Sequence, residues 1–258
     1  MTEKPIRFLK EKTLQKNKMI IGGLEKLTLI DFPGYLSAIV FTKSCNFRCH
    51  FCYNPMLVFA EGENELKNID EGPSLIPEKD LFLFLKDRVG KLEGLVISGG
   101  EPTLQPDLKE FIIKVKNLGY KIKLDTNGSN PEKLLDLIES NLLDYVAMDI
   151  KAPIDEYEKV INVKTNIDNI KKSISILIKG KVPYEFRTTL VPTLVESGDI
   201  EKMAKDITGA QKWYLQKFKS DPDLVNNDFK NKESFTDKEM KEFVEIGSKY
   251  VKECLFRE

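Results

Sequence analysis

Three cysteines give the chain its clearest chemical signal. Cys45, Cys49 and Cys52 follow one another with the spacing C-x3-C-x2-C, and one further cysteine occurs near the C-terminus. A tight group of thiols indicates metal binding rather than a disulfide scaffold, whose cysteines are spread along the sequence. Three thiolates on one short loop can bind three irons of a cubane iron–sulfur cluster and leave the fourth iron without a protein ligand. An open metal position of this kind can receive a substrate or a cofactor.

Two closed metal sites compete with this interpretation. A structural zinc site would need His50 or Cys254 as its fourth ligand. His50 is the only histidine of the chain, and it directly follows Cys49, which makes tetrahedral ligation by both awkward. An electron-transfer cluster would instead be completed by Cys254. We expect His50 to be a spacer and Cys254 to be a bystander on or near a terminal helix.

Glycines and aspartates mark the ends of several predicted strands. Gly99 and Gly100 directly follow an apolar segment, where glycine lets the backbone approach a ligand closely, although a plain turn is the alternative. Asp125 and Asp149 end the next two segments, and acidic residues at successive strand ends can converge on one face of a parallel barrel. The Thr-Asn-Gly after Asp125 also fits a plain turn, and Asp149 could instead form a solvated salt bridge with Lys151.

An arginine interrupts another apolar segment. Arg187 lies within 183–190, a predicted strand, and a buried charge there needs a partner. Arg187 therefore either contacts a ligand or forms a structural ion pair. Gln216 lies in the last predicted strand of the series, 212–217.

Strand-like and helix-like segments alternate along most of the chain. The predicted strands lie at 37–42, 94–98, 120–125, 144–150, 183–190 and 212–217. The predicted helices lie at 77–90, 106–118, 131–141, 166–178, 198–207 and 236–251. Several strands are largely apolar, as parallel strands buried on both faces are. The alternation predicts an α/β fold of right-handed βαβ units with a parallel sheet, and it leaves open whether this sheet is an open barrel or doubly wound.

Composition indicates an ordinary globular protein. Hydrophobic residues make up 41% and charged residues 31% of the 258 residues. The 40 basic and 41 acidic side chains leave a net charge of -1, which gives no bulk argument for binding nucleic acid or a membrane. No apolar run approaches the roughly 20 residues of a membrane span. The Lys-rich N-terminus lacks the apolar stretch of a signal peptide, so we expect a cytoplasmic protein.

Three regions follow from this pattern. Residues 1–19 form a charged N-terminal extension, and 20–218 form the core, which begins with a small hairpin or irregular lead-in over 20–34. Residues 219–258 comprise a polar loop and a final helix.

The cysteine motif, with the aromatic Phe51 before its third cysteine, resembles the signature of the radical S-adenosylmethionine (SAM) superfamily. The resemblance implies an incomplete (β/α)6 radical SAM barrel with parallel strands over 20–218. It also implies that Cys45, Cys49 and Cys52 are the metal ligands and catalytic residues that hold a [4Fe–4S] cluster, with SAM on the fourth iron through its amino and carboxylate groups. An electron from the cluster would cleave the C–S bond of SAM, and the 5′-deoxyadenosyl radical would abstract hydrogen.

Further motifs resemble those of glycyl-radical activating enzymes. Residues 98–102 resemble the GGEP motif that contacts the SAM amino group, and Phe51 would lie against the adenine. The D-T-N-G and D-x-K pairs imply that Asp125 and Asp149 can hold a monovalent cation near the SAM carboxylate, with Lys151 on SAM. The implied cofactor-binding residues are Phe51, Tyr53, Asn54, Gly99, Gly100, Glu101, Asp125, Thr126, Asp149, Lys151, Arg187 and Gln216.

Two departures bear on the substrate. Tyr53 and Gln216 stand where these activating enzymes often have histidine, which puts pyruvate formate-lyase in doubt as the partner. The lead-in over 26–38 resembles the longer form of anaerobic ribonucleoside-triphosphate reductase activating protein. That resemblance implies an anaerobic ribonucleotide reductase as the glycyl-radical partner and a flavodoxin or ferredoxin as electron donor. No second cysteine cluster occurs, so a ferredoxin-like insertion is absent.

Two other functions stay open at this point. One is a radical SAM enzyme that acts on a small molecule or nucleotide, as 7-carboxy-7-deazaguanine synthase does. The other is a non-enzymatic iron–sulfur or zinc module.

Overall fold

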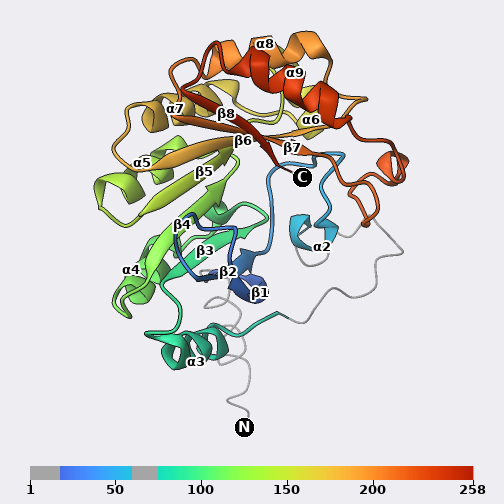
Figure 1. The fold of residues 1–258 in the computed structure, drawn as a ribbon. Helices are drawn as coiled ribbons and strands as arrows, with labels where there is room; N and C mark the ends of the chain where they lie inside the picture. The colour runs from blue at the N-terminus through green and yellow to red at the C-terminus, as the bar shows by residue number, and fades with distance from the viewer. Residues whose placement is uncertain (1–17, 60–74, 258) are drawn as a thin grey trace.

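The computed structural model describes residues 18–59 and 75–257 (Figure 1). Residues 1–17 of the expected N-terminal extension therefore lie outside the described residues. Eight strands form one sheet in the order in which they occur along the chain. They are β1 (Ile21–Thr28), β2 (Ser37–Thr42), β3 (Gly94–Gly99), β4 (Lys121–Thr126), β5 (Tyr145–Asp149), β6 (Tyr184–Leu190), β7 (Lys212–Lys217) and β8 (Glu253–Arg257).

The strand order decides between the two predicted architectures. A doubly wound sheet reverses its strand order at one point, whereas here each new strand adds beside the one before it. All pairs from β2 to β8 are parallel, and β1 pairs antiparallel with β2. The edges β1 and β8 do not pair with each other, so the sheet is an open barrel. Figure 1 shows its curvature and the helices on its outer side.

Helices connect the strands as the alternation predicts. The six expected helices are present as α3 (Glu78–Arg88), α4 (Leu108–Lys116), α5 (Pro131–Glu139), α7 (Ile167–Ile178), α8 (Ser197–Asp206) and α9 (Asp237–Gly247). Five short elements were not expected: α2 (Pro55–Val58), α6 (Tyr157–Ile161), η1 (Pro102–Leu104), η2 (Ile154–Glu156) and η3 (Asn227–Phe229). The incomplete (β/α)6 barrel is thus confirmed, with strands added at both edges.

Both added strands correct the sequence-based expectations. The lead-in does form a hairpin, but its second arm is β2 itself rather than a separate strand. At the other edge an unexpected strand, β8, follows α9; Cys254 lies on this strand and next to Gly247 of α9, which agrees with its expected place near a terminal helix. β8 has only five residues, and its sequence ECLFR places charges at both ends, which is why the apolar pattern did not reveal it.

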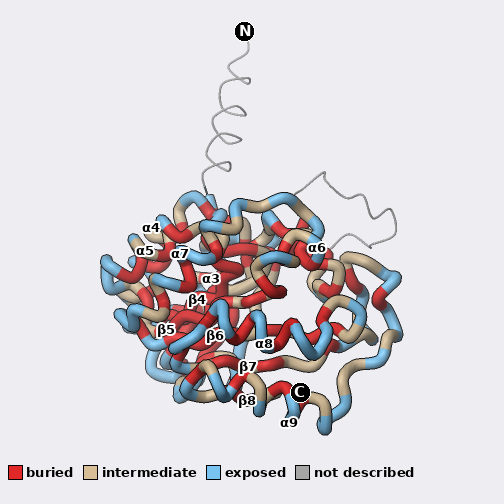
Figure 2. Tube along the Cα trace, turned by 90° about the horizontal axis from the view of Figure 1, so that it is seen from above, coloured by how far each residue is buried: buried red, intermediate tan, exposed pale blue. Residues whose placement is uncertain are grey.

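Side chains alternate between the two faces of each strand. Residues such as Ile122 and Leu124 of β4 enter the main core between the sheet and the helices. On the inner face, Phe32 joins Ile39, Val96 and Tyr145 in a second apolar cluster. Figure 2 shows how burial concentrates along the strands beneath exposed helical turns.

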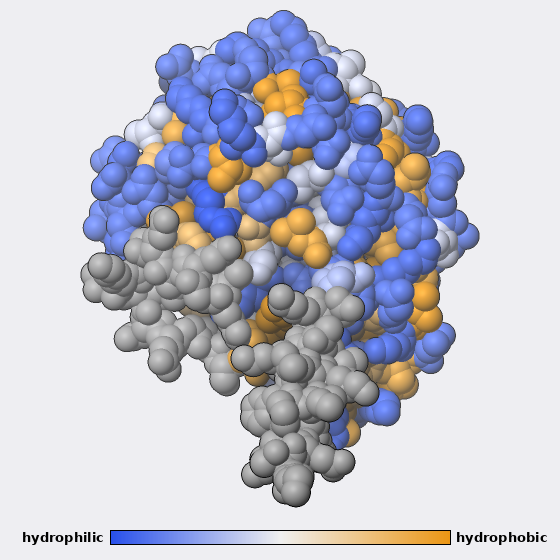
Figure 3. All heavy atoms as spheres, turned by 180° about the vertical axis from the view of Figure 1, so that it is seen from behind, coloured by the Kyte–Doolittle hydropathy of each residue, from blue (hydrophilic) through white to orange (hydrophobic). Residues whose placement is uncertain are grey.

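Figure 3 shows one face of the molecule, on which apolar residues are scattered among more numerous hydrophilic ones. None of the described helices combines the length and the apolar character that crossing a bilayer requires.

Candidate active site

The three cysteines lie on the loop between β2 and α2, beyond the C-terminal ends of the parallel strands. Backbone hydrogen bonds hold this loop to α2, from Ser44 N to Leu57 O (2.7 Å) and from Cys45 N to Val58 O (3.0 Å). The guanidinium of Arg48 donates to the carbonyl oxygen of Cys45 at 2.6 Å. These contacts fix the loop, so the three thiols share one short, ordered segment.

A distant segment also fastens the cysteine loop. Val225 N donates to the carbonyl oxygen of Cys52 at 2.9 Å, and Asn226 N donates to that of His50 at 3.1 Å. The His50 ring stacks on Phe229, with centroids 5.4 Å apart and planes 11° apart. The polar loop after residue 218, which had no assigned role, therefore belongs to the site.

Neither alternative fourth ligand is placed to complete a closed site. The His50 ring is engaged by Phe229 and by the side chain of Asn226. Cys254 pairs in register with Trp213 near the start of β7, whereas the cysteine loop lies beyond the opposite ends of the strands. Within 18–59 and 75–257, no three His, Cys, Asp or Glu side chains form a group that could hold a single metal ion. A cubane cluster differs because each thiolate binds a different iron.

Burial and a nearby cation act in opposite directions on the three thiols. Burial raises the pKa of Cys45 and of Cys49 to about 12, and it also raises the pKa of Cys52. Iron binds thiolates, so the metal's charge would have to offset this burial. The backbone N–H of Phe47 already donates to Cys45 Sγ at 3.4 Å, and nearby Lys151 lowers all three pKa values. The donor set therefore fits a [4Fe–4S] cluster.

Gly99 and Gly100 seat the next loop directly against the cysteine loop. A Cβ on Gly99, whose φ is +116°, would lie 2.3 Å from Thr42 N, and one on Gly100 would lie 2.1 Å from Ser44 O. The Gly100 N–H donates to Thr42 O, and that of Glu101 donates to Ser44 O, both at 2.8 Å. Any side chain at either glycine would separate these loops.

Glu101 ties three segments together from a fully buried position. Its Oε1 accepts from the backbone and hydroxyl of Thr103 and from the hydroxyl of Thr126. Its Oε2 accepts from Asn127 N at 2.7 Å. Burial raises the pKa of Glu101 despite these donors. The carboxyl therefore joins the loop after β3 to the loop after β4.

Asn127 reaches the cysteine loop, a contact that sequence reasoning missed. Its side-chain amide donates to Asn46 Oδ1 at 2.9 Å and lies 3.9 Å from Cys45 Sγ. The sequence presented Asn127 as an ordinary turn residue after Asp125. Only its place at a strand end next to the cysteine loop distinguishes it from such a residue.

A buried charge network lines the inner face beside the cysteines. Arg187 bridges the two aspartates, through Nη1 to Asp125 Oδ2 at 3.2 Å and through Nε to Asp149 Oδ1 at 3.0 Å. Lys123 Nζ contacts Asp125 Oδ1 at 2.8 Å, and Lys151 Nζ contacts Asp149 Oδ2 at 2.9 Å. The predicted convergence of Asp125 and Asp149 at neighbouring strand ends is thus present in the structure, and the salt bridge between Asp149 and Lys151 is partly buried.

The network favours the charged forms of Asp125, Asp149 and Lys151. Although burial raises the pKa of Asp149, Arg187 and Lys151 hold it at about 2. Arg187 and Lys123 likewise hold the pKa of Asp125 below its usual range against the effect of burial. Burial lowers the pKa of Lys151, but Asp149 outweighs this effect and raises it. Lys123 was not among the expected site residues; its position two residues before Asp125 on one strand face is the signal for it.

The other expected residues lie on the cysteine loop, at the start of α2 and near the end of β7. Phe51 is buried, with Lys151 Nζ 5.9 Å from its ring centroid. Tyr53 is 54% exposed, and Asn54 precedes the first turn of α2. Gln216 pairs in register with Thr189, two residues beyond the pair of Arg187 and Tyr214.

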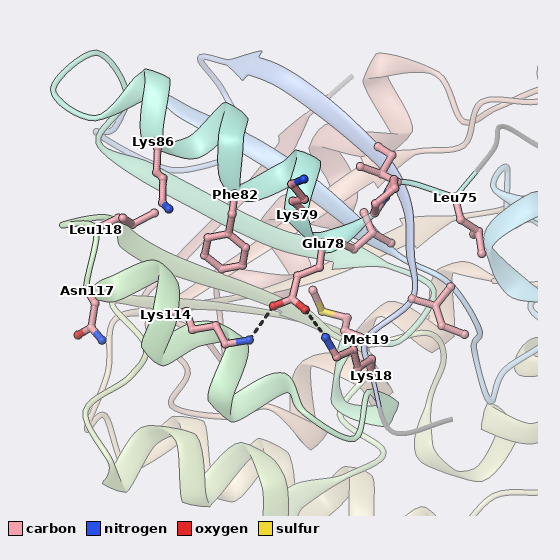
Figure 4. Close-up of a pocket in the computed structure, with 14 residues that line it drawn as sticks. Lys18, Met19, Leu75, Glu78, Lys79, Phe82, Lys86, Lys114, Asn117 and Leu118 are labelled. Atoms are coloured by element: carbon pink, nitrogen blue, oxygen red, sulfur yellow. Dashed lines mark hydrogen bonds and ion pairs between the residues drawn. The ribbon is translucent and has the colours of Figure 1, made fainter. Parts of the chain in front are cut away.

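A cavity of about 1250 Å³ lies elsewhere, between β1, α3 and α4. Figure 4 shows its apolar wall and the ion pairs of Glu78 with Lys18 (3.3 Å) and Lys114 (2.7 Å). None of the expected site residues lines it.

An open parallel barrel with three thiols beyond its first parallel strand and buried charges beside them defines a cluster-binding barrel protein. The family model of the radical SAM superfamily matches residues 39–207. The chain belongs to the radical SAM superfamily, whose members use a [4Fe–4S] cluster and SAM.

Two activating enzymes are similar in sequence to almost the whole chain. A candidate glycyl-radical enzyme activating enzyme of Methanocaldococcus jannaschii is 33% identical over 93% of this chain and 96% of its own length. The pyruvate formate-lyase-activating enzyme of Clostridium pasteurianum is 30% identical over 91% of this chain and 98% of its own length. The solved structure of TYW1 with a lysine–pyruvate adduct bound has a TM-score of 0.58 at 17% identity and covers 96% of this chain and 90% of that one, which shows the shared fold.

Proposed function

We propose that this protein cleaves SAM reductively and generates a glycyl radical on a partner enzyme. The observation that carries this proposal is the position of three ordered thiols directly beside a buried network with surplus positive charge. Near-full-length similarity to activating enzymes supports the choice of a protein glycine as the hydrogen donor. The partner we propose is an anaerobic ribonucleotide reductase in the cytoplasm, with a flavodoxin or ferredoxin as electron donor.

The residues of the chain bind and orient SAM in this proposal. Lys151 and Arg187, together with Lys123, exceed the two aspartates by one positive charge, which attracts the SAM carboxylate. Phe51 supplies an apolar surface for the adenine. The glycine pair at 99 and 100 keeps the backbone near the SAM amino group. Such fixed orientation and exclusion of water protect a reactive radical from side reactions.

Cys45, Cys49 and Cys52 would hold the [4Fe–4S] cluster, which would supply one electron for reductive cleavage of SAM to methionine and a 5′-deoxyadenosyl radical, and the Cα hydrogen of glycine would then complete 5′-deoxyadenosine. In the part of the chain that the structure describes, β1 and β8 do not pair, and we propose that a protein loop enters the barrel on this side. A flexible glycine segment of a partner fits such an opening better than a rigid domain does.

Two coupled assays test the proposal. The protein is reconstituted anaerobically with iron and sulfide, reduced and mixed with SAM, and 5′-deoxyadenosine is quantified. An anaerobic ribonucleotide reductase is then added, and electron paramagnetic resonance is recorded for the doublet of a glycyl radical. We expect both signals from the unmodified protein and from Cys254→Ala, and neither from Cys49→Ala.

The outcomes separate the competing functions. Absence of 5′-deoxyadenosine would exclude SAM cleavage. It would therefore exclude both a glycyl-radical activating enzyme and a radical SAM enzyme that acts on a small molecule or nucleotide. Formation of 5′-deoxyadenosine without a glycyl radical on any reductase tested would favour a small-molecule or nucleotide substrate instead.

A further inference from the structure

Protein cations already contact all four carboxylate oxygens of the aspartate pair. Lys123 and Arg187 take the two oxygens of Asp125, and Arg187 and Lys151 take the two oxygens of Asp149. Every one of these contacts is 3.2 Å or shorter. The monovalent cation that the family resemblance implies would have to compete with these groups for the same oxygens.

The charge balance also opposes a further cation. Three positive side chains contact two carboxylates, and the neighbouring Glu185 is paired with Arg257, so these seven side chains together carry one surplus positive charge. The side chains of Lys123, Lys151, Arg187 and the two aspartates are at most 26% exposed, and water screens their repulsion of another cation poorly. A potassium or sodium ion next to either aspartate would add to a charge that is already positive.

Lys123 has the properties of a built-in replacement for such an ion. Its ammonium is a compact point charge, as an alkali ion is, and its side chain is 1% exposed. It lies on the same strand face as Asp125, while its neighbours Ile122 and Leu124 are packed into the main core on the opposite face. The strand therefore fixes the ammonium beside Asp125. Unlike a bound alkali ion, this ammonium is covalently attached to the chain and cannot dissociate from it.

We propose that Lys123 is a positioning residue that takes the place of a monovalent cation, so that SAM cleavage by this protein is independent of potassium and sodium. Lys123 neutralises Asp125, which in turn holds Arg187 and, through it, Asp149 in place. The inference concerns SAM cleavage alone and does not depend on which partner the protein activates.

The experiment compares alkali-cation dependence in the cluster-loaded protein. The rate of 5′-deoxyadenosine formation is measured in potassium chloride and in tetramethylammonium chloride at equal ionic strength. Photoreduced deazaflavin serves as reductant, because sodium dithionite would add sodium. We expect the unmodified protein to differ by less than about twofold between the salts, and Lys123→Ala to be slower by about tenfold or more in tetramethylammonium and to recover in potassium. Lys121→Ala, two residues away on the same face but exposed and paired with Asp144, should behave as the unmodified protein.

A second readout needs no cluster. The melting temperature of the apo protein is measured in the same two salts. Potassium should raise it for Lys123→Ala, where the ion can enter the vacated space, and leave it unchanged for the unmodified protein and for Lys123→Met, whose apolar chain fills that space.

Two results would overturn the proposal. One is stimulation of the unmodified protein by potassium of about tenfold or more over tetramethylammonium. The other is a potassium-independent rate in Lys123→Ala equal to that of the unmodified protein. If Lys123→Ala does not fold, the unmodified protein and Lys123→Met decide the question. A Lys123→Met rate equal to that of the unmodified protein in tetramethylammonium would also overturn it.

Discussion

At the residue scale, one buried carboxyl joins the loops that surround the site. Glu101 accepts four hydrogen bonds from three residues, and its side chain has no exposure to water. A buried donor that loses its acceptor costs about 1–3 kcal/mol. The hydrogen bonds of Glu101 therefore hold the loops after β3 and β4 in position.

We predict that Glu101→Ala lowers the free energy of unfolding by about 3 kcal/mol or more, because several buried hydrogen-bond donors lose their acceptor at once. Glu101→Gln keeps the shape and one acceptor oxygen, so its loss should be smaller. Glu110→Ala, at an exposed position in the first turn of α4, is the matched control and should change stability by less than about 0.5 kcal/mol. Urea unfolding of the apo protein measures all three, and equal effects of Glu101→Ala and Glu110→Ala would contradict this role.

The cysteine spacing and the strand-end aspartates were predictable because they are local patterns that precede or follow apolar runs. Lys123 and Asn127 were not recognised as site residues. The spacing of Lys123 two residues before Asp125 was a local signal, but the contact of Asp125 with Arg187 that gives it a role exists only in the folded sheet. Asn127 contacts Asn46, which lies far from it in the sequence.

At the element scale, β8 contributes a positively charged side chain to the inner face of the sheet. Arg257 donates to Glu185 Oε2 at 3.3 Å, and its guanidinium lies 3.4 Å from the ring centroid of Tyr214. Glu185 is 1% exposed and also accepts from the Tyr145 hydroxyl at 3.1 Å. The last strand therefore neutralises a buried carboxylate on β6, two strands away from it.

Removing this cation should destabilise the open edge. We expect Arg257→Ala to cost about 1–2 kcal/mol of unfolding free energy, a value reduced from that of a fully buried pair because Arg257 is 36% exposed. Lys212→Ala breaks the exposed pair with Glu253 between β7 and β8, and it should cost less than about 0.5 kcal/mol. Urea unfolding compares the two variants. The assignment fails if Lys212→Ala is as damaging as Arg257→Ala.

The six parallel strands were predictable, whereas the edge strand β8 was not. β2 to β7 are apolar on the helix-facing side and carry polar groups near their ends, a pattern that sequence periodicity detects. β8 is short, and its identity depends on pairing with β7. The choice between an open barrel and a doubly wound sheet depends on strand order, and the periodicity of the sequence does not determine that order.

At the scale of the whole molecule, the two halves of the sequence meet at the cysteine loop. The segment around Val225 and Phe229 binds that loop from the C-terminal side, and α2 binds it from the N-terminal side. Protein contacts therefore hold the loop from both sides, which suits a site that must orient SAM rigidly. No local sequence pattern predicted this arrangement, because Val225 and Cys52, which the hydrogen bond joins, are separated by most of the barrel sequence.

The central claim is that three thiolates leave one iron of the cluster open to SAM. Pulsed electron paramagnetic resonance on the reduced, reconstituted protein with SAM labelled with 15N at its amino group tests it most directly. The account predicts a hyperfine coupling between that nitrogen and the cluster, present in Cys254→Ala and lost when Cys49 is replaced. A reduced cluster without nitrogen coupling in saturating SAM, or a metal bound by four protein ligands, would contradict it.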